Sequence, residues 1–305
     1  MKNRNHTGAI RRHKKAKDEI ILDVVKVTVL LIVVVITVFP FWNIFVISMN
    51  DATDAIRGKL YFWPRQFSLA SYAEIFRRSE FIASIKVSVA RTLIGTPAAV
   101  LCTTMLAYVL ARKDLIFKKG ITLLFIFTMY FGGGLVPYYM VLKNLHLLDN
   151  FMVYIFPNII SVYNMILVRS YIESMPEEIF ESAKLDGAND FTIFFKMVLP
   201  LSKPIIMTIG LFVAVMHWNS WFDAYLYTSS QSLKPMQSIL VEILNQYQTG
   251  TSVSDQMSKA ASGSSVTPDS IRMAATMVAT IPIMMVYPFV QKYFVKGIML
   301  GAVKS

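Results

Sequence analysis

Six stretches of mostly apolar residues, each roughly 20 residues long, constrain this chain more than any other feature of its sequence. They lie at about residues 21–48, 87–111, 120–142, 151–168, 204–227 and 273–295, with polar or basic segments between them. A helix of roughly 20 apolar residues crosses the hydrocarbon core of a bilayer and satisfies its own backbone hydrogen bonds there. The sequence therefore predicts an all-α membrane protein with six transmembrane helices.

The composition excludes several other classes of protein. Of the 305 residues, 55% are hydrophobic and 16% are charged, whereas soluble domains carry about 25% charged residues. This excludes a disordered chain, a coiled coil and an ordinary cytosolic enzyme. The single cysteine, Cys102, allows no intrachain disulfide, and the four histidines are scattered along the chain, so we expect no metal site.

The basic residues predict the topology. The net charge is +11, yet Lys and Arg lie between the apolar stretches rather than along one stripe, which argues against nucleic-acid binding. If both termini are cytoplasmic, the segments on that side carry about twice as many Lys and Arg as the outer segments. We expect a basic cytoplasmic tail over residues 1–20, a six-helix membrane domain over 21–298 and a C-terminal tail over 299–305. The first apolar stretch is interpreted as a retained anchor, because it is too long for a signal peptide.

Three segments outside the regular pattern carry separate expectations. Residues 49–82 contain several aromatic side chains and predict a folded loop or an interfacial helix, whereas residues 248–268 are rich in Ser, Thr and Gly and predict a flexible loop. Gly132, Gly133 and Gly134 lie inside the third apolar stretch. Close helix packing is the favoured interpretation of these glycines, and a hinge or break in the helix is the alternative.

The polar loop between the fourth and fifth stretches, residues 173–203, predicts two short helices joined by a sharp turn. Pro176 suits a first helical turn, and Gly187 suits a left-handed residue that ends the helix. Asn189 or Asp190 is the expected cap of a second helix, whose apolar stripe comprises Phe191, Phe194, Phe195 and Val198. This shape suits docking into a groove of a partner protein. Binding to the lipid surface is the alternative, and the excess of Asp and Glu in this loop disfavours it, because inner-leaflet lipids are anionic.

Residues 181–200 resemble the EAA motif of the permease subunits of bacterial ABC importers, which reads Glu-Ala-Ala, three residues, Gly, nine residues and Ile-x-Leu-Pro. Glu181-Ser182-Ala183 matches the first element, Gly187 follows after three residues, and Met197-Val198-Leu199-Pro200 completes the pattern. Ser182 and Met197 depart from it, and both are small or apolar. The triplet Asp186-Gly187-Ala188 and the segments 131–137 and 282–304 are similar to the carbohydrate-uptake branch, so the resemblance covers nearly the whole chain.

This resemblance implies a fold, partners and a mechanism. The fold would be that of the MetI-like permeases, and residues 173–203 would contain a coupling helix that docks on a separate ATP-hydrolysing subunit. The coupling residues would be Glu181, Ser182, Ala183, Asp186, Gly187, Leu199 and Pro200. Closure of an ATPase dimer would switch the permease from inward- to outward-facing. A sister permease subunit, in a heterodimer, and an external solute-binding protein would complete the assembly.

A second group of residues indicates where a solute could pass. Trp218, Asn219, Trp221 and Asp223 lie close together in the outer half of the fifth stretch. Aromatic rings stack on sugar faces and amides bond sugar hydroxyls, so a sugar path is one interpretation. An interfacial aromatic belt with an interhelical hydrogen bond is the other. Asn43 and Asn164 are further candidates for such a path.

We therefore expect a multi-pass permease of the cell membrane that moves a carbohydrate, more specifically an oligosaccharide, inward. The chain lacks the Gly-x-x-x-x-Gly-Lys-Ser/Thr pattern of nucleotide-binding loops, so it is not expected to be an enzyme or to hold a cofactor. ATP and Mg²⁺ would be bound by the partner ATPase. The alternative is an ion-coupled secondary carrier of a small polar solute, which needs buried carboxylates or paired charges within the membrane.

Overall fold

The computed structural model describes residues 17–250 and 266–302. Within these ranges the regular elements are helices, and one isolated bridge pairs Asn50 with Phe67. Three helices are long and apolar enough to cross a membrane: α1 (Lys17–Ser48), α4 (Ser79–Ala111) and α15 (Pro268–Ala302). Three bent pairs of helices also qualify, which gives up to six spans if each pair is one span. The predicted all-α membrane fold is confirmed.

Two of the bent pairs lie within stretches that the sequence presented as continuous, and the third lies at the predicted junction between residues 173–203 and the fifth stretch. The first joins α5 (Lys118–Tyr130) to α6 (Leu135–Asn144) at 114°. The second joins the 3-10 helices η1 (Phe151–Tyr154) and η2 (Phe156–Asn158) to α7 (Val162–Glu173) at 45°. The third joins the segment from α9 (Asp190–Ile193) to α10 (Leu199–Leu201) with α11 (Lys203–Asn219) at 81°. Pro200 and Pro204 lie at this last bend, where proline suits a helix start.

The glycine run in the third stretch breaks the helix, so the favoured interpretation as a packing contact is wrong for this chain. Residues 131–134 are not helical, and Gly134 has a φ of +87°. A Cβ atom at Gly132 or Gly134 would have no heavy atom within 4 Å. Backbone freedom, rather than close approach of another helix, therefore explains these glycines.

Short helices cover one end of the bundle. They are α2 (Ala52–Ala55), α3 (Ala70–Arg77), α12 (Phe222–Tyr227), η4 (Gln231–Leu233) and α13 (Met236–Gly250). The expected folded loop over 49–82 is present. Asp54 stabilises this loop by accepting hydrogen bonds from Asn50 and Arg65, both at 2.9 Å. The hydrogen bond from Asn50 is the main cause that lowers the pKa of Asp54. The sequence did not predict α13, and most of the expected flexible loop lies in residues 251–265, outside the described residues.

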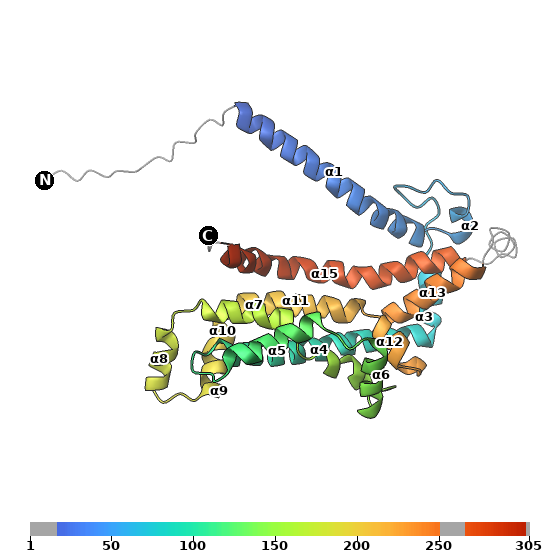
Figure 1. The fold of residues 1–305 in the computed structure, drawn as a ribbon. Helices are drawn as coiled ribbons and strands as arrows, with labels where there is room; N and C mark the ends of the chain where they lie inside the picture. Colours follow the sequence, from blue (N-terminus) through green and yellow to red (C-terminus); the bar gives the residue numbers. More distant parts are fainter. Residues whose placement is uncertain (1–16, 251–265, 303–305) are drawn as a thin grey trace.

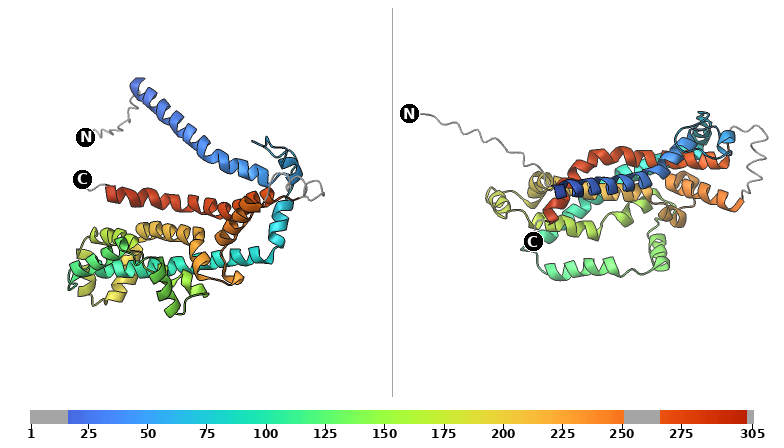
Figure 2. Two further views of the ribbon diagram at one scale, coloured as in Figure 1. Left: turned by 45° about the vertical axis from the view of Figure 1, so that its right-hand side comes forward. Right: turned by 90° about the horizontal axis from the view of Figure 1, so that it is seen from above.

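Most of the long helices run roughly parallel to one another, and the connecting elements lie at the two ends of the bundle (Figure 1). The helices α4, α7, α11 and α15 run side by side, whereas α5 stands apart from them in the view from above and α1 diverges from them toward its Lys17 end (Figures 1 and 2). The loop helices α8 (Glu178–Leu185) and α9 lie at the same end as the start of α1 and the end of α15. The opposite end carries α2, α3 and α13. This arrangement is what the predicted topology requires, with residues 173–203 on the same side as the start of α1 and the end of α15.

Three clusters of buried side chains hold the bundle together. One cluster joins the ends of α4 and α7 to α8 and α9, and it includes Ala107, Ile172, Ala183 and Ile193. A second joins α3, α13 and α15 at the opposite end, and a third joins η1 to α6 and α12. Many apolar side chains stay outside these clusters, and those of α1 from Ile20 to Val38 are largely exposed. Exposed apolar surface of this extent suits a lipid environment or a partner subunit.

Candidate functional site

The segment from Glu177 to Leu201, which we name the elbow, has the helix–turn–helix form that the sequence predicts. Its first helix, α8, ends at Leu185, and Gly187 follows with a φ of +78°. A Cβ at Gly187 would have no neighbour within 4 Å, so the left-handed backbone, and not a lack of space, requires glycine here. Asn189 caps α9 through its side-chain oxygen, which accepts a hydrogen bond from the Thr192 backbone at 2.8 Å.

The predicted apolar stripe of the second helix is only partly correct. Phe194 and Val198 are buried, but Phe191 is 67% exposed and Phe195 is 49% exposed. The reason is a π-helix over residues 194–198, between α9 and α10. Its i→i+5 bonding widens the turn and rotates the side chains away from regular α-helical spacing. Ile193, which the predicted stripe omitted, is buried instead.

The predicted coupling residues divide into a buried group and an exposed group. Ala183 is buried and Leu199 packs beside it in the same apolar cluster. The predicted coupling residues on the surface of the elbow are Glu181, Ser182, Asp186, Gly187 and Pro200. Sequence reasoning missed Leu185, which is 89% exposed although it is apolar. With Phe191 and Phe195 it gives the elbow an apolar surface next to its acidic residues.

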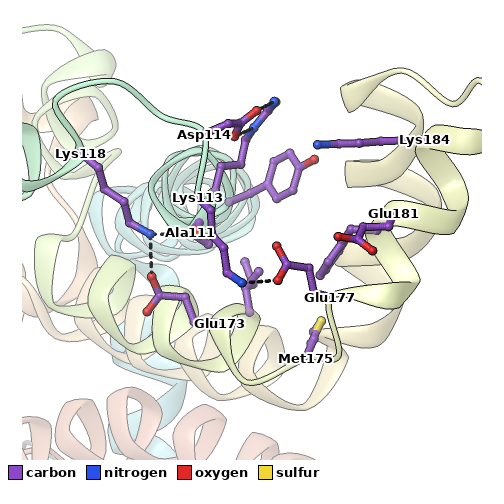
Figure 3. A pocket seen from close by; sticks show the side chains of 13 residues that line it. Ala111, Lys113, Asp114, Lys118, Glu173, Met175, Glu177, Glu181 and Lys184 are labelled. Carbon is purple, nitrogen blue, oxygen red and sulfur yellow. Dashed lines mark hydrogen bonds and ion pairs between the residues drawn. The ribbon is translucent and has the colours of Figure 1, made fainter.

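A pocket of about 420 Å³ separates α8 from the loop that follows α4 (Figure 3). Basic and acidic side chains from both elements line it and face each other across it. Lys113 pairs with Glu177, and Lys118 pairs with Glu173 at 3.0 Å. Within residues 17–250 and 266–302, Glu181 forms no ion pair, although it lines the same pocket.

Arg112 makes the most extensive charged contacts near the elbow. It binds Asp114 at 2.5 Å within its own loop and Asp190 of α9 at 2.6 Å. The Arg112 hydrogen bond lowers the pKa of Asp114 to about 2, and the two carboxylates in turn raise the pKa of Arg112. Arg112 and Asp114 therefore remain charged at cellular pH. The sequence analysis assigned no role to Arg112, because its partner Asp190 is distant in the chain.

A second charged site lies inside the bundle, where the sequence placed only Asp223. Arg91 of α4 is fully buried and binds Asp223 at 2.5 Å, and it also donates a hydrogen bond to the Ser220 carbonyl at 3.3 Å. Its guanidinium lies 4.3 Å from the centre of the Tyr154 ring. Asp223 is therefore the counter-ion of Arg91 rather than an unengaged solute ligand. The pair ties α4 to the break between α11 and α12.

The other candidates for a solute path are dispersed. Asn43 donates a hydrogen bond to the Leu60 carbonyl at 2.5 Å, and Trp218 donates one to the Ala279 carbonyl at 3.0 Å, so both hold the fold together. Asn219 accepts a hydrogen bond from Gln237 at 3.4 Å, and Asn164 is buried. Trp221 is 37% exposed. Of these candidates, Trp221 best retains the aromatic surface that a sugar requires.

Trp221 belongs to an exposed aromatic group that the sequence did not define. Its ring contacts those of Phe222 and Tyr225, with centroids 5.6 and 6.1 Å away. Phe222 is 48% exposed and Tyr225 is 69% exposed. A second group, formed by Tyr138, Tyr139 and Tyr227, joins α6 to the same short helix α12. The break in the third stretch is what brings α6 to this position.

Comparison with known proteins supports the same assignment. Residues 66–300, more than half of the chain, match the family described as "Binding-protein-dependent transport system inner membrane component". The polygalacturonan/rhamnogalacturonan transport system permease protein YtcP of Bacillus subtilis is 40% identical over 90% of this chain and 96% of its own length. Protein LplC of the same organism is 36% identical over 88% of this chain and 90% of its own length.

A solved structure is also similar. A bacterial ABC transporter involved in the import of the acidic polysaccharide alginate superposes with a TM-score of 0.84 and 26% identity. The match covers 92% of this chain and 99% of that one. Fold, motif and relatives agree, and the resemblance drawn from residues 181–200 is confirmed. The chain belongs to the binding-protein-dependent transport system inner membrane components, the multi-pass permease subunits of ABC importers.

Proposed function

We propose that this chain is one permease subunit of an importer that carries oligosaccharides into the cell, driven by ATP hydrolysis on a separate subunit. The observation that carries this proposal is the elbow at one end of the bundle, which presents exposed Leu185 and Glu181, a residue that forms no ion pair with the described part of the chain. The relatives that import polygalacturonan and alginate support an oligosaccharide cargo, and their substrates are acidic. An acidic oligosaccharide is therefore the first solute to test.

The elbow has the surface that a protein partner requires. Leu185, Phe191 and Phe195 expose apolar groups, and anionic side chains flank them. Anionic lipid headgroups repel such a surface, whereas a groove with basic residues attracts it. The elbow end therefore faces the cytoplasm and docks on the ATPase subunit. ATP and Mg²⁺ are held by that subunit, and this chain supplies the docking residues from Glu181 to Pro200.

A sister permease fits the surface of α1. The side chains of α1 from Ile20 to Val38 are largely exposed, and this helix diverges from the remainder of the bundle (Figure 2). A second permease subunit that packs along α1 would bury part of that area and complete a two-subunit translocation path. The external binding protein would deliver solute at the opposite end, near α3 and α13.

The exposed aromatic group of α12 is the proposed solute surface. Replacing Trp221 by alanine removes the largest ring of this group. The contact of a large aromatic side chain with a ligand raises the affinity about tenfold or more. We expect the uptake rate to fall about tenfold, with unchanged binding of solute to the separate binding protein. The matched control is Trp63→Ala, which removes an exposed ring from the 49–82 loop. Equal uptake by the two variants would remove Trp221 from the path.

The proposed function is tested in vesicles that contain both permease subunits and the ATPase, with solute-loaded binding protein outside. Galacturonate oligomers and neutral oligomers of equal length are compared, with ATP or a non-hydrolysable analogue inside. We expect ATP-dependent accumulation of an oligosaccharide. Accumulation driven by a sodium or proton gradient without ATP would instead support the ion-coupled carrier. The buried Arg91–Asp223 pair is the one feature of the described residues that such a carrier would also need.

A further inference from the structure

The loop between α4 and α5, residues 112–117, forms a set of bonds to the elbow that neither the motif nor the relatives assign. Together with Lys118, the first residue of α5, it supplies three cations, and each binds an acidic residue on the elbow or immediately before it. Lys118 binds Glu173 at the end of α7, and Lys113 binds Glu177 before α8 (Figure 3). Arg112 binds Asp190 at the start of α9. The contacts therefore reach both helices of the elbow and the chain that leads into it.

Arg112 is the best oriented of these cations. Two hydrogen bonds to Asp114, of 2.8 and 2.5 Å, hold one edge of its guanidinium, and Nη1 remains directed at Asp190. A planar guanidinium held along one edge fixes the direction in which Nη1 can bind Asp190, whereas a lysine ammonium can rotate freely. The side chain of Arg112 is 28% exposed, whereas that of Lys113 is 79% exposed. Exposed ion pairs contribute little, so Lys113 is expected to be the weakest of the three. Lys118 is 24% exposed, and what distinguishes Arg112 from it is the fixed direction of the guanidinium and the contact with the second helix of the elbow.

Apolar packing connects the same two elements below the charges. The Tyr108 and Phe194 rings lie 5.7 Å apart, and Ala107 and Leu110 share a buried cluster with Ala183 of α8. Close-packed side chains of this kind transmit displacement rather than absorb it. The elbow is thus attached to α4 by charged contacts at the surface and by packing underneath.

The helix α4 runs without interruption from this attachment to Arg91, the residue that binds Asp223 at the start of α12. The 21 residues from Arg91 to Arg112 correspond to a helical length of about 32 Å. One continuous helix, with Pro97 inside it, therefore links the elbow at one end of the bundle to the α11–α12 break, which lies beside Trp221. The chain turns by 81° between the elbow and α11, so the covalent connection to that helix is bent, although Ile205 and Ile209 of α11 share the buried cluster of the elbow.

From these contacts we propose that residues 112–118 act as a clamp, in which Arg112 is the positioning residue that makes the elbow and α4 move together. The inference rests on the proposed function, since it states how the docked elbow passes the ATPase movement to the solute path. Without the clamp the elbow still docks, but its displacement is absorbed by bending at Gly187 and at the proline-rich junction with α11. ATP hydrolysis then continues with less solute transported per ATP.

The test uses the assembled importer in vesicles and two substitutions that remove the pair from either side, Arg112→Gln and Asp190→Asn. We expect each to retain the ATPase subunit in purification and to lower solute transported per ATP about fivefold, the effect of one partly buried charged pair. The double variant is expected to transport as much solute per ATP as the more impaired of the two single variants, because each single substitution already removes the same contact. The matched control is Lys119→Gln. Lys119 is an exposed cation beside Lys118 and forms no ion pair with another described residue.

Three results would overturn the clamp. One is loss of the ATPase subunit from Arg112→Gln, which would place Arg112 in the docking surface. Another is an unchanged ratio of solute to ATP, and the third is additive loss in the double variant. If Arg112→Gln does not fold or insert into the membrane, Arg112→Lys is used instead, because it keeps the positive charge but lacks the planar guanidinium. Amide hydrogen exchange in residues 178–190 of that variant then reports the clamp directly. Exchange is expected to rise about fivefold, and an unchanged rate contradicts the clamp. Absence of ATP-dependent uptake in the unmodified importer would refute the proposed function instead.

Discussion

Replacement of Glu181 by lysine is expected to abolish ATP-linked uptake while the permease still inserts and folds. Glu181 is exposed and has no ion pair within the described ranges, so the substitution breaks no ion pair among those residues. It places a cation where a basic groove of the ATPase subunit would accept an anion. Removing one member of a buried interfacial charge pair costs about 2–5 kcal/mol, and reversal adds repulsion, so uptake should fall by on the order of 100-fold or more.

Copurification of the ATPase subunit with the permease is the direct measurement, followed by uptake in vesicles. The matched control is Glu80→Lys, the same substitution at an exposed residue in the first turn of α4, at the other end of the bundle. It alters the net charge equally and should retain both the partner and transport. Normal uptake by the Glu181 variant would remove that residue from the docking role, whereas equal losses in the two variants would indicate a general effect of charge.

Removal of Arg91 is expected to have the largest effect on folding. Substitution by methionine leaves the Asp223 carboxylate without its counter-ion inside the bundle, and it also removes the contact with the Tyr154 ring. Breaking a buried pair from one side costs about 3–5 kcal/mol, because an uncompensated charge remains in a region that solvates it poorly. Most of the variant should therefore be lost to misassembly, or should melt well below the unmodified chain in detergent.

The double substitution Arg91→Met with Asp223→Leu separates the charge effect from simple loss of packing. It removes both charges and replaces them with apolar groups, so thermal stability in detergent should return close to that of the unmodified chain. Transport is expected to stay low, because the double variant no longer ties α4 to the start of α12. A single Arg91→Met variant that melts like the unmodified chain would show that water or lipid already neutralises Asp223.

Much of the fold was predictable because membrane spans leave a strong signal in the sequence. The six apolar stretches, the shared side of residues 173–203 and both termini, and the turn at Gly187 all follow from local hydrophobicity, charge and backbone conformation. The bend between α5 and α6 was not predicted, because glycine within an apolar stretch suits either a break or close packing. Helix α13 was missed because a surface helix of this kind has neither the length nor the apolarity of a span.

The candidate site was predicted unevenly for a related reason. The elbow is local in sequence, so Glu181, Gly187 and Leu199 could be identified from the match of residues 181–200 to the EAA motif. The buried pair joins Arg91 to Asp223, and the clamp joins Arg112 to Asp190, across more than 70 residues in each case. Spacing along the chain carries no information about such contacts. Asn43 and Trp218 were assigned to the path by residue type, but their hydrogen bonds hold neighbouring segments in place.

The sequence by itself determined that this chain lies in a membrane and presents an acidic elbow on the side of its termini, because desolvation of the backbone and the preference of basic loops for the cytoplasm act on local segments. Only the tertiary structure decided which charges meet. Within a bundle the energy of a charge depends on the nearest opposite charge and on its distance from water, and both are set by how helices distant in the sequence pack. The roles of Arg91 and Arg112 therefore emerge only from the assembled bundle.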